Sequence, residues 1–160
     1  MGLERNDVLS KKRIIMPKYK TLTSILSKKF SDVVIEYFTN ELVNLNQKEN
    51  TIFLDKKVIT DALKMASDCS YTVFTSIDGS NNEIPYSGLL REKEVIDATH
   101  LIFIIEQNGK FTSEDITKII EEIKNSIADY TNFDNTKVIY GDYITEEMSE
   151  DFKITALILK

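Results

Sequence analysis

The sequence predicts an α+β fold, in which a mixed sheet of about four strands packs with helices and is preceded by a long helix. Two kinds of segment predict it. Apolar residues recur at helical spacing in two long stretches, and short runs rich in β-branched and aromatic residues lie between and after them. The chain has 160 residues, 42% of them hydrophobic, which suffices for one ordinary core. We therefore expect one globular domain.

Two helices are expected first. The apolar residues of the first helix lie three and four positions apart, as on one face of an amphipathic helix: Phe30, Val33, Val34, Tyr37, Phe38, Leu42 and Leu45. The polar stretch from Asn46 to Asn50 ends this helix. A second helix is expected from about Asp55 to Ser67, with Asp55 as its N-cap.

The middle of the chain is expected to hold two strands separated by a short helix. The first strand runs from Ser70 to Ile77 and is closed by Asp78-Gly79, a turn signal. The short helix is expected from about Ser87 to Ala98. The next run, Leu101 to Ile105, is continuously apolar, which favours a strand buried on both faces. We expect it at the centre of the sheet.

A capped helix and two strands complete the predicted fold. Thr112 precedes Glu114 and Asp115, and the apolar stripe that follows is Ile116, Ile119, Ile120, Ile123 and Ile127. The strands are expected at Lys137 to Tyr140 and at Phe152 to Leu159. The loop between them carries Glu146, Glu147, Glu150 and Asp151. These residues lack the spacing of a calcium loop, so we expect a solvated loop and no metal site.

Composition excludes several classes of protein. The single cysteine, Cys69, excludes an internal disulfide framework, and the single histidine, His100, leaves too few soft ligands for a structural zinc site. We expect Cys69 to be a small buried hydrophobe and His100 a packed or edge residue. No apolar run approaches the roughly 20 residues of a membrane-spanning helix. We expect a cytoplasmic protein without cofactor.

The charge is unevenly distributed along the chain. Residues 1–29 hold eight basic and two acidic residues, a net charge of +6, whereas residues 30–160 carry −12 of the total of −6. We therefore expect a basic leader over 1–29 and a folded domain over 30–160. The leader is either a solubilising segment or a basic arm that contacts DNA or an anionic membrane. The residues of that arm are Lys11, Lys12, Arg13, Lys18 and Lys20.

The segment from Ser87 to Lys160 resembles the C-terminal domain of the FtsZ/tubulin superfamily of polymerising GTPases, and the bacterial FtsZ branch in particular. The resemblance rests on the order and spacing of several short motifs: Gly88-Leu89-Leu90, Asp97-Ala98 before the apolar strand, the helix after Phe111-Thr112, Lys137-Val-Ile-Tyr-Gly141, and Phe152-Lys-Ile-Thr155. It implies a two-layer sandwich of helices on a mixed sheet, preceded by the family's central helix.

The likeness extends upstream. Ser31-Asp-Val-Val34 and Thr51-Ile-Phe-Leu-Asp55 resemble the family's central helix and its catalytic loop, and Arg13-Ile-Ile-Met-Pro17 resembles the last strand of its GTP-binding domain. Asp32 matches an acidic residue that faces the guanine base in the family; here we expect it to be a solvated carboxylate. The sequence has five glycines, and no two lie close enough for a phosphate-binding loop.

The catalytic loop departs from the family pattern. In the family an Asn-x-Asp-x-x-Asp segment meets the nucleotide of the next subunit and positions the attacking water. The matching positions here are Phe53, Asp55 and Val58, of which Asp55 alone keeps a carboxylate, and Lys56 and Lys57 add positive charge. Asp55 is either a helix N-cap or a remaining catalytic-loop carboxylate. The resemblance makes Phe53, Asp55, Lys56 and Lys57 an expected interface.

Three functions remain open. The first is a non-enzymatic FtsZ-like cytoskeletal protein that binds or caps an FtsZ/tubulin-type filament in cell division or plasmid partition. The second is a C-terminal fragment of a full-length polymerising GTPase, with GTP hydrolysis in the other half. The third is an adaptor that uses the basic arm on DNA or a membrane, which steep salt dependence of DNA binding would reveal. The expected partner is a filament subunit or a second copy, and no small-molecule substrate is expected.

Overall fold

The computed structural model describes residues 32–76, 90 and 92–160, and within them the predicted order of elements is confirmed. The helices are α3 (Asp32–Gln47), α4 (Lys56–Met65), α5 (Glu92–Val95) and α6 (Ser113–Ser126). The strands are β1 (Cys69–Ser76), β2 (His100–Gln107), β3 (Lys137–Ile144) and β4 (Phe152–Leu159).

The described strands form one mixed sheet in the order β1-β4-β2-β3. β4 is antiparallel to both of its neighbours, and β2 is parallel to β3. In this register Phe103 lies opposite Tyr140 on one side and Ala156 on the other. The α+β class and the mixed sheet are thus confirmed.

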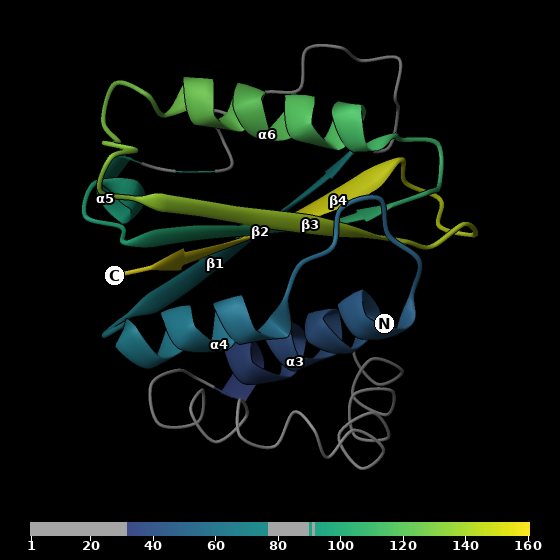
Figure 1. Cartoon of the computed structure of the whole chain (residues 1–160), viewed down its shortest axis with the longest axis horizontal. Helices are drawn as coiled ribbons and strands as arrows, with labels where there is room; N and C mark the ends of the chain where they lie inside the picture. The colour runs from purple at the N-terminus through teal and green to yellow at the C-terminus, as the bar shows by residue number, and fades with distance from the viewer. Residues whose placement is uncertain (1–31, 77–89, 91) are drawn as a thin grey trace.

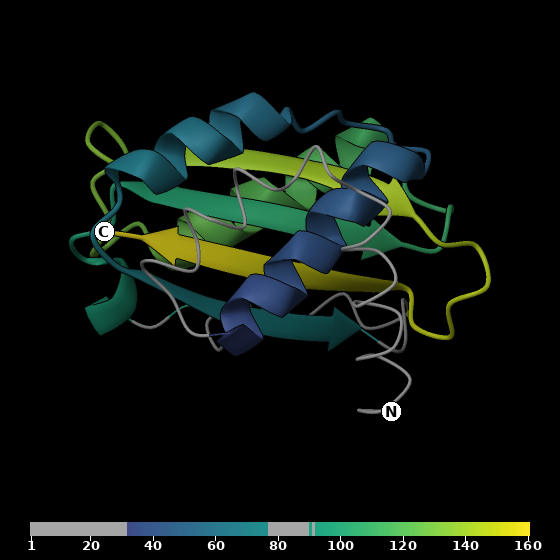
Figure 2. The ribbon, with the colours of Figure 1, turned by 90° about the horizontal axis from the view of Figure 1, so that it is seen from below.

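Helices cover both faces of the sheet. α6 lies on one face with α5 near one end, and together with the sheet these helices form the predicted two-layer sandwich (Figures 1 and 2). The leading helices α3 and α4 lie on the opposite face and add a third layer. The sheet is therefore the middle layer, and β2 and β4 are its inner strands.

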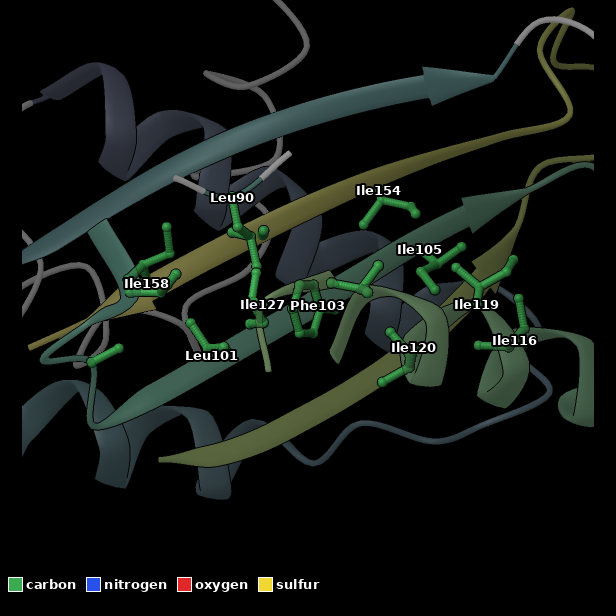
Figure 3. Packing of buried hydrophobic residues seen from close by; sticks show 14 of the residues in the cluster. Leu90, Leu101, Phe103, Ile105, Ile116, Ile119, Ile120, Ile127, Ile154 and Ile158 are labelled. Atoms are coloured by element: carbon green, nitrogen blue, oxygen red, sulfur yellow. The ribbon is translucent and has the colours of Figure 1, made fainter. Parts of the chain in front are cut away.

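The continuous apolar run in β2 supplies both cores. Ile102 and Ile104 pack into the core beneath α3 and α4, whereas Leu101, Phe103 and Ile105 pack into the core beneath α6. Figure 3 shows the second core, where these β2 side chains meet the isoleucines of α6. Because successive side chains of a strand point to opposite faces, a strand covered on both sides must be apolar throughout. The prediction that Leu101 to Ile105 is buried on both faces is confirmed.

Capping residues define the starts of two helices. The Asp55 carboxylate accepts a hydrogen bond from the Lys57 backbone N–H at 2.9 Å and is the N-cap of α4. Thr112 and Asp115 form a reciprocal capping box at the start of α6, which lowers the pKa of Asp115 through hydrogen bonds from Thr112. Both predicted helix starts are confirmed.

Some boundaries differ from the prediction. The short helix expected to reach Ala98 ends at Val95, where the Ala98 N–H bonds the Val95 carbonyl in a turn. β3 continues beyond Tyr140 to Ile144, because it pairs there with the end of β2 on one side and with the chain before α4 on the other. Phe38, Leu42 and Leu45 of the first stripe are buried as expected. The other predicted members, Phe30, Val33, Val34 and Tyr37, lie outside the side chains described, as do the turn at Asp78 and the strand at 13–17.

Cys69 and His100 both begin strands. Cys69 is half-buried against the core beneath α3 and α4, and burial, reinforced by Asp68, raises the pKa of its thiol to about 12. The His100 ring shares a 3.0 Å hydrogen bond with the Thr99 hydroxyl. Partial burial and the neighbouring Lys137 lower the pKa of His100.

Candidate interaction surface before helix α4

The segment between α3 and α4 lies along the outer edge of β3. The Ile144 N–H donates to the Glu49 carbonyl at 2.8 Å, and the Asp142 N–H donates to the Ile52 carbonyl at 3.2 Å. The segment therefore satisfies part of the backbone of an edge strand, which would otherwise expose unpaired groups. It also brings residues 49–54 to a fixed position beside the sheet.

A buried carboxylate holds this segment in place. Asp142 is 0% exposed, and one of its oxygens accepts 2.8 Å hydrogen bonds from the backbone N–H groups of Thr51 and Ile52. The other oxygen accepts from the Thr51 hydroxyl at 3.0 Å and from the Gln107 side-chain amide at 2.8 Å. Four donors thus satisfy a carboxylate that would be costly to bury without partners.

The absence of a side chain at Gly141 lets the segment approach β3. A Cβ atom at this position would collide with the Leu54 Cβ atom and would lie 3.0 Å from the Ile52 carbonyl oxygen. Leu54 is 6% exposed and belongs to the core beneath α3 and α4. The segment is therefore fixed on both sides of Phe53, by Asp142 before it and by Leu54 after it.

Phe53 consequently projects from a held backbone. Its side chain is 70% exposed, and Val58, in the first turn of α4, is 43% exposed. Asp55 and Lys57 are exposed and Lys56 is half-buried. The four residues predicted as an interface thus lie on one continuous stretch, which we call the 53–58 surface. Whether that stretch binds a partner stays a prediction.

The Asp55 carboxylate caps α4, so one of its two interpretations is confirmed. Its bond to the Lys57 N–H is made by one oxygen. A role for this carboxylate in activating water stays a prediction. Phe53 and Val58, on either side of Asp55, carry apolar side chains.

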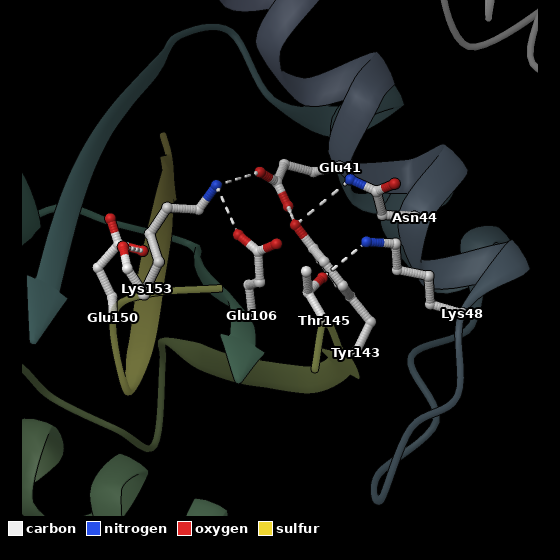
Figure 4. Close-up of polar contacts among 9 residues, drawn as sticks. Glu41, Asn44, Lys48, Glu106, Tyr143, Thr145, Glu150 and Lys153 are labelled. Carbon is white, nitrogen blue, oxygen red and sulfur yellow. Dashed lines mark hydrogen bonds and ion pairs between the residues drawn. The ribbon is translucent and has the colours of Figure 1, made fainter. Parts of the chain in front are cut away.

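A second polar cluster fixes α3, which leads into this segment (Figure 4). Glu41 is 1% exposed, accepts a 2.6 Å hydrogen bond from the Tyr143 hydroxyl, and pairs with Lys153 at 3.1 Å. Lys153 also pairs with Glu106 at 3.1 Å. Burial, followed by the nearby charge of Glu41, raises the pKa of the Tyr143 phenol far above its usual value. These contacts join α3 to β2, β3 and β4.

Sequence reasoning missed Asp142, Gln107, Glu41 and Lys153. Two features of the sequence could have indicated buried polar groups. Glu41 lies between Phe38, Leu42 and Leu45 on an otherwise apolar helix face, and Asp142 follows a glycine inside a strand. A charged residue at a position that the pattern marks as buried indicates a paired group. Neither signal identifies the partner.

Several predicted residues lie outside the described part of the chain. The basic arm, with Lys11, Lys12, Arg13, Lys18 and Lys20, is among them, and so is the side chain of Asp32. Within residues 32–76, 90 and 92–160 there is no group of three or more His, Cys, Asp or Glu side chains placed to hold a metal ion. None of the described helices is long and apolar enough to cross a membrane.

Comparisons with known proteins give a structural match and no sequence match. No family model matches the chain, and no curated protein matches it. Among solved structures, an empty FtsZ dimer from M. jannaschii matches with a TM-score of 0.62 at 16% identity, over 81% of this chain. The fold is that of the FtsZ C-terminal domain. A point mutant of M. jannaschii FtsZ agrees, with a TM-score of 0.60 at 17% identity over 81% of this chain.

The match covers a minor part of each FtsZ chain. This chain spans 37% of the first FtsZ chain and 38% of the second. A CetZ from Methanosaeta thermophila strain DSM 6194 is a weaker match, with a TM-score of 0.47 at 14% identity over 79% of this chain and 36% of its own. The likeness to the two FtsZ chains therefore establishes the fold and leaves activity to be tested.

Proposed function

We propose that this chain binds an FtsZ/tubulin-type filament subunit through the 53–58 surface and caps the filament, without a GTPase site of its own. The observation that carries the proposal is Phe53, which is 70% exposed on a segment fixed by Asp142 and Leu54. In the family that the sequence resembles, the matching loop meets the nucleotide face of the next subunit. A chain with this surface and no nucleotide face would accept no further subunit.

The chemistry of the 53–58 surface supports association rather than hydrolysis. Burying an exposed aromatic side chain contributes about 1.5–3 kcal/mol, and Val58 adds a smaller apolar contact. Neither side chain orients water, and Asp55 already accepts a hydrogen bond from the Lys57 N–H. The surface therefore supplies binding energy where the family's loop supplies catalytic groups. A role in cell division or plasmid partition follows from the filament it would bind.

A titration into the polymerising FtsZ-type GTPase of the same organism tests the proposal. GTP turnover and pelleted polymer are followed together, with Phe53→Ala as the interface variant. Ile96→Ala is the matched control, because Ile96 is an exposed apolar residue near α5, on another part of the molecule. We expect the native chain and Ile96→Ala to reduce both readouts at substoichiometric ratios, and Phe53→Ala to be much weaker. No change with the native chain would overturn the proposal.

A second candidate is a fragment of a longer polymerising GTPase, and the partial coverage of the FtsZ chains favours it. In that case GTP binding and hydrolysis reside in the other part of the protein. An antibody against this chain distinguishes the two on a blot of native cells. A band near twice the mass of these 160 residues supports the fragment, and a band at their own mass supports the capping protein.

A further inference from the structure

The 53–58 surface has a counterpart on the same molecule. A shallow pocket of about 270 Å³ lies at the end of β3 and is lined by Lys48, Glu49, Ile144, Thr145, Glu146 and Glu147. An engineered apolar cavity of about 150 Å³ holds a benzene ring, so this pocket has room for a phenyl group. Its lining includes one isoleucine and three glutamates.

The charges of the two sites are opposite. Phe53 is followed by Asp55, Lys56 and Lys57, a net charge of +1, whereas Lys48, Glu49, Glu146 and Glu147 give the pocket a net charge of −2. The one lysine of the pocket, Lys48, donates a 2.6 Å hydrogen bond to the Thr145 hydroxyl. Residues 30–160 carry a net charge of −12, and the two lysines beside Phe53 make this surface locally basic. Such complementarity favours pairing of the two sites between copies.

Both sites lie on the same edge of the molecule. Glu49 of the pocket and Phe53 belong to the one segment that follows the outer edge of β3, and the Ile144 N–H bonds the Glu49 carbonyl at 2.8 Å. In a dimer with two-fold symmetry, the 53–58 surface of each copy meets the pocket of the other copy. Every favourable contact is then made twice.

We propose that a second copy of this chain docks on this edge, with Phe53 of each copy in the pocket beside Ile144 of the other, and Lys56 and Lys57 facing Glu146 and Glu147. The dimer buries Phe53, so it competes with filament binding through the same residue. The dimer forms without any filament protein and is tested in its absence. Failure of the dimer therefore leaves the filament proposal standing, and the reverse also holds.

Sedimentation velocity over a concentration series tests the dimer, at low and at physiological salt. We expect a reversible monomer–dimer equilibrium whose Kd rises with salt. Phe53→Ala should raise the Kd by at least about thirtyfold, as the loss of a central aromatic anchor does. Ile96→Ala should leave the Kd unchanged. A monomer at every concentration, or a dimer that is indifferent to Phe53→Ala, would overturn the proposal.

A charge exchange tests the pairing of the sites. Lys57→Glu and Glu147→Lys each place like charges together and should weaken the dimer about tenfold. The double variant restores opposite charges and should recover most of the native affinity. Both residues are exposed, so the variants are expected to fold, which circular dichroism checks. A double variant no stronger than the single variants would show that these two residues do not face each other, and would overturn the proposed arrangement.

Discussion

Asp142 is the residue on which the position of the 53–58 surface depends most directly. Its carboxylate accepts from two backbone N–H groups, one hydroxyl and one side-chain amide, all within 3.0 Å. The Gln107 amide that donates to it also donates to the Phe111 carbonyl at 3.0 Å. Asp142 therefore links the segment before α4 to the turn that leads into α6.

Asp142→Asn is expected to lower the free energy of unfolding by about 1–3 kcal/mol. The new amide group would face the Gln107 amide, so two donors would meet where a donor now meets an acceptor. Urea unfolding followed by circular dichroism measures the change. Asp129→Asn, at an exposed position, is the control and should be neutral. Equal unfolding midpoints for the two variants would contradict the role given to Asp142.

The thiol of Cys69 is expected to react slowly in the folded protein. Its pKa rises from 9.0 to about 12 on folding, so at about pH 9 half of the unfolded chains carry a thiolate and few folded chains do. The neutral thiol therefore favours the folded state below pH 9, and this contribution is lost as the pH rises toward 12. Alkylation at pH 9 should be at least about tenfold slower without urea than with it. Equal rates would contradict the prediction.

Among the elements, α3 depends on polar contacts as well as on its apolar stripe. Glu41→Ala removes the acceptor of the Tyr143 hydroxyl and an ion-pair partner of Lys153. We expect a loss of about 2–3 kcal/mol, because a buried hydroxyl and a partly buried ammonium lose a charged partner.

Thermal or urea unfolding measures this loss, with Glu121→Ala as control. Glu121 pairs with Lys124 on the exposed surface of α6, and such pairs contribute at most about 1 kcal/mol. If Glu41→Ala were as stable as Glu121→Ala, the polar cluster would not be what anchors α3.

The elements that local periodicity encodes were predictable from the sequence. The isoleucine stripe of α6 and the apolar run of β2 follow from burial on one and on two faces, and both are confirmed. The end of β3 was not predictable, because Gly141 is a signal for a strand end. Its role is to leave space for Leu54, with which it makes a contact between residues far apart in the sequence. Asp142 escaped prediction for the same reason, since its partners Thr51 and Ile52 lie about ninety positions away.

At the scale of the whole molecule, the sequence resemblance and the structural match agree on the fold of the FtsZ C-terminal domain. The resemblance also selected the 53–58 surface, which burial alone would have indicated through the exposure of Phe53 and Val58. The basic arm at residues 11–20 lies outside the described residues, and its binding of DNA or membrane stays a prediction. What the fold leaves to experiment is the partner of the 53–58 surface.

The length of FtsZ filaments in electron micrographs tests filament capping most directly. Filaments assembled with GTP are measured at increasing ratios of this chain to FtsZ, beside the Phe53→Ala variant. Capping through the 53–58 surface predicts that mean length falls from substoichiometric ratios onward, and that Phe53→Ala leaves filaments long. Unchanged lengths, or equal shortening by the native chain and Phe53→Ala, would contradict the account.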